Sequence, residues 1–308
     1  NAELRNDILS DIAGGSCHIA VGTHAIFQEQ VRFNKLGLVV IDEQHRFGVR
    51  QRNEFMQKGD HPHLLVMSAT PIPRSLAMTL YSDLDISAIR QLPSGRKPIK
   101  TAVRFNKDRE GIYNFMRQQV SEGEQVYVIY PLIEESEVMD LKDATRGYEK
   151  LKNRFPEFSV DLLHGRLDSS EKEEIMKRFA EGETDILVST TVVEVGVDVP
   201  NATIMMIEHA ERFGLSQLHQ LRGRIGRGKK QSYCILLPDR AISKSGKFRM
   251  KKMAETTDGF EIAEADLKLR GPGDFLGTKQ SGLPDFRYAD IVEDRWILEQ
   301  AKESAGRI

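Results

Sequence analysis

The sequence predicts an α/β fold with two parallel-sheet lobes, followed by a smaller and mainly helical unit. Short apolar runs rich in Val, Ile and Leu alternate with longer helix-like segments, which is typical of a mostly parallel sheet covered on both faces. A stretch rich in Pro, Ser and Gly, residues 91–98, interrupts this alternation and is predicted to link the two lobes. The length of 308 residues suits about two domains.

The apolar runs place the expected strands in two blocks. The first block has strands near residues 17–21, 37–41, 64–67 and 86–89, and the second near residues 99–105, 126–130, 159–163, 186–189, 203–207 and 233–237. Helices are best indicated at residues 169–179, where Asp168 and Glu171 have the spacing of a capping box, and at residues 216–225. After Leu237 the pattern changes to charged helical segments, a Gly-rich loop and a final helix. The expected domains are residues 1–95, 96–240 and 241–308.

Composition excludes several classes of protein. With 40% hydrophobic residues, 29% charged residues and a net charge of −2, the chain has the composition of a globular protein. No apolar run approaches the roughly 18 residues of a membrane helix. Cys17 and Cys234 are too far apart in sequence for a CxxC metal knuckle, and we expect both in the core of a protein of the reducing cytosol. The chain begins with Asn1 and no leader pattern follows, so we expect no secretion signal and a fragment of a longer protein.

The near-neutral total hides a basic stretch between Gln217 and Lys252. It contains eleven basic residues and one acid, Asp239, which gives a local charge of 11 − 1 = +10. A stretch this dense binds polyanions unless it is a solvated face, and the run alone leaves both interpretations open.

Two adjacent acids follow the first long apolar run. Residues 36–41 end in Asp42-Glu43-Gln44-His45, and the carboxyl ends of buried parallel strands are where ligands bind in open α/β sheets. One carboxylate can hold Mg²⁺ through water while its neighbour orients the water that attacks a γ-phosphate. Taken alone, such a pair is more often a helix cap or a solvated turn, so its context must decide.

Other polar segments follow neighbouring runs. Residues 64–67 end in Ser68-Ala69-Thr70, and this strand tip is expected beside Asp42. In the second block, residues 186–189 lead into a segment that ends at Pro200. If residues 217–227 are helical, one face presents Gln217, Gln220, Arg224 and Arg227. Two arginines presented toward an acid pair suit an arginine-finger role, with a solvated arginine face as the alternative.

A phosphate-loop match near this segment is rejected. Gly223, Gly228 and Lys229 fit the opening of the pattern, but Lys230 stands where a Ser or Thr must bind Mg²⁺. The preceding segment is also predicted to be a helix and not a strand.

Taken in this order, the segments resemble the motifs of superfamily 2 helicases. Asp42-Glu43-Gln44-His45 resembles motif II, Ser68-Ala69-Thr70 motif III, Val21-Gly22-Thr23-His24 motif Ib, residues 130–136 motif IV, residues 163–166 motif IVa, residues 189–200 motif V and residues 217–227 motif VI.

Finer detail resembles the RecG family of fork-reversal helicases. The resemblance lies in residues 42–49, 68–74, 258–263 and 269–282, and the last of these is similar to the family's TRG translocation motif. The transcription-repair coupling factor Mfd shares the motor and this element and is the close alternative. Pro272 and the run from Pro131 to Glu137 favour RecG.

The resemblance implies a fold and residue roles. The fold would be two RecA-like lobes, the first shortened at its N-terminus, with a helical TRG element, and the cofactors would be ATP and Mg²⁺. Catalytic roles fall on Asp42, Glu43, Gln220, Arg224 and Arg227, with Asp42 holding Mg²⁺ through water. Nucleotide contacts are implied for His45, Gly196, Asp198 and Gln217. Contacts to DNA, or coupling to its movement, are implied for Thr23, His24, Thr70, His164, Arg166, Thr190, Arg249, Arg270 and Gln280.

The resemblance also implies partners and a role in DNA repair and recombination. The expected partners are double-stranded and branched DNA, such as forks and Holliday junctions, together with a single-stranded-DNA-binding protein. The protein would be a monomer of the bacterial cytoplasm, associated with the nucleoid and with no membrane.

The sequence departs from the family pattern at one end. The family's phosphate loop, motif Ia and N-terminal wedge domain have no counterpart in the chain. We therefore expect little or no ATPase activity from the chain alone, because the phosphate loop supplies most of an ATP site. The alternatives are an Mfd-like translocase, a DNA-binding module without catalysis, and a purely structural protein on a motor-like fold.

Overall fold

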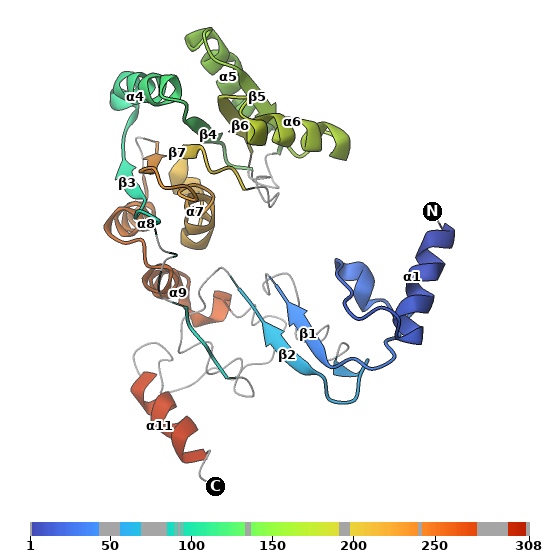
Figure 1. Ribbon diagram of the computed structural model, residues 1–308. Coiled ribbons are helices and arrows are strands. Elements are labelled where there is room, and N and C mark those ends of the chain that lie inside the picture. Colours follow the sequence, from blue (N-terminus) through green and yellow to red (C-terminus); the bar gives the residue numbers. More distant parts are fainter. Residues whose placement is uncertain are drawn as a thin grey trace. The chain divides into compact units, whose positions relative to one another are not determined.

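The computed structural model describes residues 2–42, 56–68, 85–89, 91, 93, 95–132, 137–190, 198–239, 242–275 and 295–305. The chain forms two compact units, Asn1–Thr70 and Pro71–Ile308 (Figure 1). Within the described residues, no helix is both long enough and apolar enough to cross a membrane.

The first unit contains a small parallel sheet. Its described elements are α1 (Ala2–Gly14), the 3-10 helix η1 (His24–Phe27), β1 (Leu38–Ile41) and β2 (His63–Val66). β1 and β2 pair in parallel from Leu38 opposite His63 to Ile41 opposite Val66. Val39 and Ile41 are buried against partly buried side chains that include Phe27 and Phe33. The strands predicted at 37–41 and 64–67 are confirmed within one or two residues.

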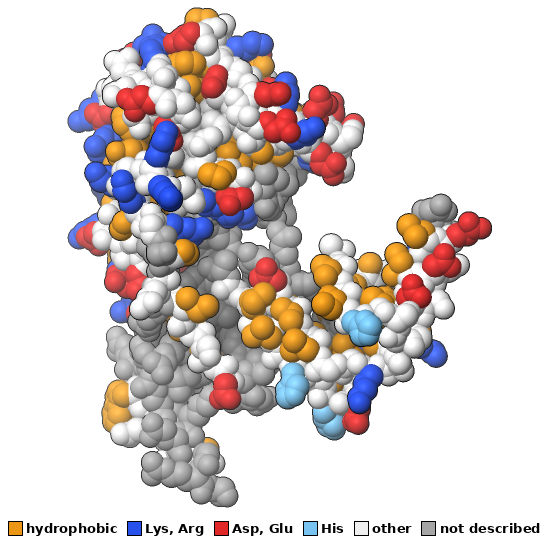
Figure 2. Space-filling view, viewed as in Figure 1, with side chains coloured by type: hydrophobic (Ala, Val, Ile, Leu, Met, Phe, Trp, Pro, Cys, Tyr) orange, Lys and Arg blue, Asp and Glu red, His pale blue; other side chains and the backbone are white. Residues whose placement is uncertain are grey.

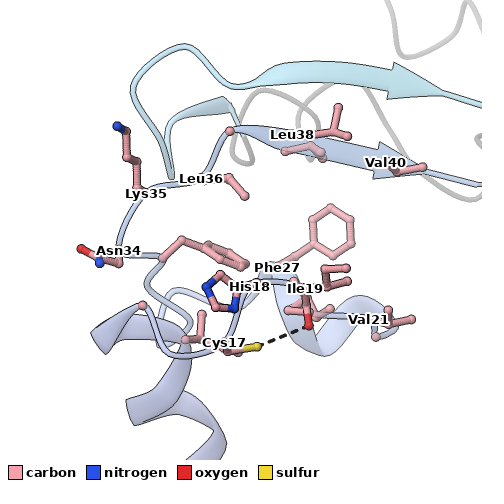
Figure 3. Close-up of a pocket in the computed structure, with 18 of the residues that line it drawn as sticks. Cys17, His18, Ile19, Val21, Phe27, Asn34, Lys35, Leu36, Leu38 and Val40 are labelled. Carbon is pink, nitrogen blue, oxygen red and sulfur yellow. Dashed lines mark hydrogen bonds between the residues drawn. The ribbon is translucent and has the colours of Figure 1, made fainter.

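The strand predicted at residues 17–21 does not form. A cavity of about 970 Å³ lies between this segment and β1, lined by Cys17, Ile19, Leu38 and Val40 among others (Figure 3). The side chains of Ile19 and Val21 are 82% and 92% exposed. An apolar run becomes a strand only where a neighbouring backbone pairs with it, and across this cavity none does. Cys17 is only half-buried, contrary to expectation, whereas Cys234 is buried.

The second unit is built on a six-stranded parallel sheet of order β3-β8-β7-β4-β6-β5. The strands are β3 (Lys100–Val103), β4 (Gln125–Ile129), β5 (Val160–Leu163), β6 (Ile186–Ser189), β7 (Ala202–Glu208) and β8 (Tyr233–Leu237). All six were predicted from the sequence. The strand predicted at residues 86–89 is absent, and Ile86 and Ile89 are exposed.

Helices cover both faces of this sheet, because alternate strand residues point to opposite sides. On one face, α4 (Arg109–Ser121) and α5 (Glu137–Arg154) share a core with β4 residues Val126 and Val128. On the other face, α6 (Ser169–Glu181) and α7 (Leu215–Arg222) share a core with Tyr127 and Ile129. The short 3-10 helices η3 (Asn106–Asp108) and η5 (Ala210–Arg212) precede α4 and α7.

Local signals explain the start of α6. The Asp168 carboxylate accepts a hydrogen bond from the Glu171 backbone N–H at 2.8 Å, and the Glu171 carboxylate accepts one from the Asp168 N–H at 3.1 Å. This reciprocal pair is the capping box that the spacing predicts.

The helices after β8 bury their apolar side chains in the same core. α8 (Lys244–Glu255) contributes Met250 and Met253, and α9 (Gly259–Phe275) contributes Ile262 and Ala265, to the face that α6 and α7 cover. A last helix, α11, spans Arg295–Ala305. The structure therefore places α8 against the edge strand β3 and α9 against α7 and α8.

Candidate functional site

Asp42 lies where the sequence predicts, at the carboxyl end of a parallel strand pair. It follows β1 directly and its side chain is exposed. The next strand ends beside it, because the Met67 N–H donates to the Ile41 carbonyl at 2.8 Å. The expected proximity of the two strand tips is confirmed as far as Ser68. Parallel strands thus present a carboxylate and a hydroxyl side chain at one edge of the small sheet.

Motif VI is helical only in its first half, which corrects the predicted helix. α7 ends at Arg222, and the Arg224 and Ile225 N–H groups donate to Leu221 and Arg222 in turns of three residues. Gly226 then takes a left-handed backbone conformation with φ +76. Gln217 and Gln220 therefore lie on the helix, whereas Arg224 and Arg227 follow it in the loop. The four side chains do not share one helical face, because two glycines end the helix early.

Gln217 has a structural contact in addition to its predicted nucleotide role. Its side-chain oxygen accepts a hydrogen bond from the Gly214 N–H at 3.0 Å and so caps the start of α7. Gln220 is half-buried further along the same helix.

Residues of motifs V and VI meet around Tyr127. Nη1 of Arg227 lies 3.5 Å from Oδ1 of Asp198. Burial raises the pKa of the Tyr127 phenol to about 12, while the charges of Arg224 and Arg227 oppose this rise and that of Asp198 adds to it. Arg227 and Asp198 thus bring motifs V and VI together, and both charges, with that of Arg224, act on the Tyr127 phenol. Tyr127 was not predicted as a site residue, because its only signal in the sequence is a hydroxyl within a run of buried strand residues.

A second group of predicted residues meets at the carboxyl ends of β5 and β6. Leu163 pairs with Ser189, and the Thr190 N–H donates to the Leu163 carbonyl at 3.2 Å, which brings Thr190 beside His164. Nδ1 of His164 and Oγ1 of Thr190 are buried and have no hydrogen-bond partner among the described residues. Burial lowers the pKa of His164, and the nearby Lys172 and Arg166 lower it further. Arg166 itself is exposed.

Two buried polar atoms without partners are costly unless water or a ligand pairs with them. The edge formed by His164, Arg166 and Thr190 therefore suits an external hydrogen-bonding ligand.

The remaining predicted DNA residues differ in their settings. Thr23 is exposed at the start of η1, and His24 is the first residue of that helix. Arg249 points inward from α8, where its Nη2 donates to the Glu211 carbonyl of η5 at 2.7 Å. It therefore ties α8 to the segment between β7 and α7. Arg270 lies in α9. The predicted residues Glu43, His45, Thr70, Gly196 and Gln280 lie outside the described residues.

Arg222 is a structural residue that the sequence analysis counted only as part of the basic stretch. The side chain is buried, and its Nη1 donates to Oγ1 of Thr101 at 3.2 Å and to the carbonyls of Met253 and Thr256 at 2.9 Å each. Its Nη2 lies 3.2 Å from Nδ1 of His219. Burial lowers the pKa of His219 to about 4, and the Arg222 charge contributes to this. Arg222 thus joins α7, β3 and the end of α8.

The basic stretch is therefore not one surface. Arg222 and Arg249 make internal hydrogen bonds, Lys230 pairs with the buried carboxylate of Glu124, and Lys252 pairs with Glu261 at 2.8 Å. Lys244, Lys247 and Lys251 remain exposed along α8. Lys230 stands where a phosphate loop would need a Ser or Thr. In the structure it pairs with the buried carboxylate of Glu124.

The described residues fit a nucleotide with a water-bound metal better than a metal held by the protein alone. No group of three or more His, Cys, Asp or Glu side chains in the described ranges could hold a metal ion. Mg²⁺ keeps several waters and is usually bound through one or two carboxylates and substrate phosphates. In the first unit, Asp42 supplies one carboxylate of this kind. In the second unit, considered by itself, Arg224 and Arg227 supply donors of the type that binds phosphate oxygens.

Three protein families match successive parts of the chain. "DEAD/DEAH box helicase" matches residues 2–79, "Helicase conserved C-terminal domain" matches residues 109–229, and "ATP-dependent DNA helicase RecG, domain 3, C-terminal" matches residues 256–308. The first two cover the segments that resemble motifs Ib to III and IV to VI.

Relatives match over almost the whole chain. The ATP-dependent DNA helicase RecG of Synechocystis sp. is 56% identical over 98% of this chain and 36% of its own length. The RecG of Streptococcus pneumoniae is 54% identical over 100% of this chain and 46% of its own length. The chain thus spans less than half the length of these relatives.

Solved structures agree with the fold. The structure of RecG bound to a three-way DNA junction is 46% identical, has a TM-score of 0.72, and is matched over 97% of this chain and 38% of that one. The DUF1998 helicase MrfA, 16% identical with a TM-score of 0.52 over 83% of this chain and 41% of that one, shares the fold. The relatives above bear the RecG name and not that of Mfd, which decides between the two families that the motifs left open. The chain therefore belongs to the RecG family of helicases and matches the C-terminal part of those proteins.

Proposed function

We propose that this chain is the motor part of an ATP-dependent helicase that moves along double-stranded DNA and remodels branched DNA in repair and recombination. The observation that carries the proposal is the meeting of Asp198 with Arg224 and Arg227 around Tyr127. It groups residues of motifs V and VI in the second unit, as a motor that senses a γ-phosphate requires.

ATP and Mg²⁺ are the proposed cofactors. Bound ATP supplies the phosphoryl group, and Asp42 would hold Mg²⁺ through water while Glu43 orients the attacking water. Arg224 and Arg227 would stabilise charge on the transferring phosphoryl group, and their donors suit that role. Gln220 completes the proposed catalytic residues. The proposed nucleotide contacts are made by His45, Gly196, Asp198 and Gln217.

The proposed DNA contact lies at the carboxyl ends of β5 and β6. Nδ1 of His164 and Oγ1 of Thr190, which have no hydrogen-bond partner among the described residues, support it together with the exposed side chain of Arg166. Thr23, His24 and Thr70 would touch the backbone of DNA from the first unit. The RecG structure that matches this chain is bound to a three-way DNA junction, which supports forks and Holliday junctions as substrates.

We propose that residues 241–308 couple the motor to DNA movement as a TRG element. Arg249 supports this, because it joins α8 to the segment that leads into motif VI. Arg270 and Gln280 would contribute from α9 and from the Gly-rich loop. Monomeric action, a single-stranded-DNA-binding protein as partner, and a bacterial cytoplasmic location at the nucleoid complete the proposal.

ATP turnover tests the proposal in two proteins. The purified chain, which contains no phosphate-loop match, is expected to bind duplex DNA with little or no ATPase activity. A longer protein that joins a phosphate loop to this chain is expected to hydrolyse ATP and to unwind forked DNA. Glu43→Gln in that protein is expected to abolish both ATP hydrolysis and unwinding. Fork unwinding that survives Glu43→Gln would contradict the proposed motor.

A DNA-binding module without catalysis is the second candidate, favoured by the buried polar atoms of His164 and Thr190 that have no hydrogen-bond partner among the described residues. It predicts salt-dependent duplex binding by the chain, and no ATP turnover even when a phosphate loop is joined to it.

A further inference from the structure

Two phenylalanine rings are exposed among basic side chains on one flank of the second unit. Phe105, directly after β3, is 39% exposed, and Phe248, on α8, is 41% exposed. Phe155, Phe179 and Phe213 of the same unit are buried, whereas Trp296 on α11 is 61% exposed. The surroundings of the two rings therefore decide whether their exposure has a role.

The two rings lie on the same side of the sheet. Ile99 and Val103 pack against the core that α8 covers, and Thr101 bonds Arg222 on that side. Because strand residues alternate, Phe105 continues this row, and its backbone is extended with φ −116 and ψ 168. Phe105 thus faces the α8 side of the sheet.

The rings also lie at a similar height along the sheet. Arg222 bonds both Thr101, near the start of β3, and the carbonyl of Thr256, at the end of α8. The end of α8 therefore lies beside the start of β3, and α8 runs opposite to the strand. Phe248 precedes Thr256 by about 12 Å of helix, and Phe105 follows Thr101 by about 13 Å of strand.

Lysines surround the rings. Lys244, Lys247, Phe248 and Lys251 are exposed at spacings of i, i+3, i+4 and i+7, which puts them on one face of α8. Lys107, beside Phe105, is also exposed. Figure 2 shows Lys and Arg side chains gathered along this flank of the second unit. We call these residues the Phe105–Phe248 surface.

Acidic side chains also lie on this flank. Glu255 pairs with Lys251 at 3.6 Å, and Asp108 accepts a hydrogen bond from the Phe105 N–H at 3.0 Å, which turns its carboxylate toward the backbone. Glu211 lies against Gly246 at the start of α8, and its carboxylate accepts a hydrogen bond from the Asp239 N–H. The surface thus combines four exposed lysines with two partly exposed aromatic rings.

We propose that the Phe105–Phe248 surface binds single-stranded nucleic acid, with bases stacked on the two rings and phosphates beside the lysines. A basic surface that carries exposed aromatic rings is the arrangement that holds single strands without regard to sequence. A duplex hides its base faces and would leave both rings without a role. An acidic peptide would satisfy the lysines, but planar rings offer it no particular advantage.

This surface is separate from the duplex contact proposed above. β3 and β5 are the two edges of the six-stranded sheet, so His164 and Phe105 belong to strands about 24 Å apart. A motor that remodels branched DNA produces single strands, and the surface would hold one of them away from the duplex.

Fluorescence anisotropy with a labelled oligothymidylate tests the proposal on the purified chain, at low salt and without ATP. Phe105→Ala and Phe248→Ala are each expected to weaken binding by about 5- to 150-fold, the range for losing one stacked base. Phe248→Tyr, which keeps an aromatic face, is expected to bind nearly as well as the parent. Equal weakening by Phe248→Tyr and Phe248→Ala would overturn the stacking.

Two lysines in matched settings provide the charge control. Lys251 is 75% exposed and pairs with Glu255 four residues on, and Lys177 on α6 is 72% exposed and pairs with Glu181 in the same way. Lys251→Gln is expected to reduce the salt dependence of binding by about 0.7 in the log–log slope, whereas Lys177→Gln leaves it unchanged. Equal effects of the two changes would mean that only overall charge matters, which would overturn the site.

Competition experiments distinguish single-stranded nucleic acid from the other possible ligands, a duplex and an acidic peptide. A duplex of the same length or an oligo-aspartate peptide that displaces the oligothymidylate equally well, with no effect of Phe248→Ala, would assign the surface to that class and overturn the proposal. Thermal unfolding of each variant checks that it is folded. The assay needs no ATP, so failure of the proposed motor activity would not by itself remove this binding.

Discussion

The guanidinium of Arg227 lies beside the carboxylate of Asp198, with Nη1 and Oδ1 3.5 Å apart. This distance exceeds the 2.7–2.9 Å of a strong charge-assisted hydrogen bond, and the side chains are 27% and 59% exposed. Such a pair contributes little to stability. The interaction of Asp198 with Arg227 is thus weak. An anionic ligand could therefore compete with Asp198 for the N–H donors of Arg227.

Replacing Arg227 is expected to separate turnover from stability. In a protein that carries a phosphate loop ahead of this chain, Arg227→Ala should lower ATP turnover by roughly 10³-fold, the scale of a lost arginine finger, with nucleotide binding largely kept. The free energy of unfolding should fall by less than about 1 kcal/mol. Arg146→Ala is the control, because Arg146 is also in a loose surface pair, 3.9 Å from Asp143. Turnover equal to that of the Arg146→Ala control would remove Arg227 from the site.

The low pKa of His219 predicts how stability depends on pH. The His219 pKa is about 4 in the folded chain against 6.5 in its unperturbed form, first because of burial and then because of Arg222, with Asp258 acting in the opposite direction. Between these values the unfolded chain binds more protons, so stability is complete above pH 6.5 and falls as the pH drops toward 4. The loss should reach about 3 kcal/mol.

Denaturant unfolding of the purified chain at several pH values measures this loss. His219→Gln should flatten the pH dependence between 6.5 and 4, since Gln does not titrate there. An unchanged difference between pH 7 and pH 4.5 in this variant would assign the acid sensitivity to other groups.

A largely buried ion pair joins the start of α4 to the end of β7. Arg109 donates through Nη1 and Nη2 to the two carboxylate oxygens of Glu208 at 2.5 and 2.9 Å, and Nη1 also donates to the Tyr113 hydroxyl at 3.1 Å. Arg109→Met leaves a buried carboxylate without its partner and should lower the free energy of unfolding by about 3–5 kcal/mol.

The double variant Arg109→Met with Glu208→Leu should recover much of that loss, because it removes the unpaired charge. Chemical denaturation of the two single variants and the double variant gives the coupling free energy. Additive losses would show that the two side chains do not depend on each other.

The second sheet was predictable because its signals are local. The central strands β4, β6 and β7 are buried on both faces, and the α6 start is encoded by Asp168 and Glu171 three residues apart. Asp42 at a strand tip was predictable for the same reason. Motif order then identified the family, which comparisons confirm.

Features that depend on distant parts of the chain were not predictable. The apolar run at 17–21 reads as a strand, but pairing requires a neighbour, and a cavity lies there instead. The role of Arg222 is fixed by Thr101 and Thr256, which are 121 and 34 residues away. Nothing in its local sequence distinguishes this buried arginine from Arg224 or Arg227.

Thr190 offers a way to separate DNA binding from folding. Its hydroxyl oxygen is buried without a described partner at the carboxyl end of β6, next to His164. Thr203, at the start of β7, is buried, and its hydroxyl likewise has no hydrogen-bond partner in the part of the chain that the structure describes. Each Thr→Val change removes an unsatisfied polar atom and keeps the volume, so neither should lower the free energy of unfolding by more than about 1 kcal/mol.

Only Thr190→Val should weaken duplex binding, because only Thr190 lies at the proposed DNA contact. Losing one hydrogen bond to a phosphate should reduce affinity by about 3- to 10-fold. Anisotropy titrations of both variants with a labelled duplex at fixed salt provide the comparison. If Thr203→Val weakened binding as much as Thr190→Val, the effect would come from a general change in the sheet and not from a contact of Thr190 with DNA. That result would contradict the proposed duplex contact at the carboxyl ends of β5 and β6 without contradicting the fold.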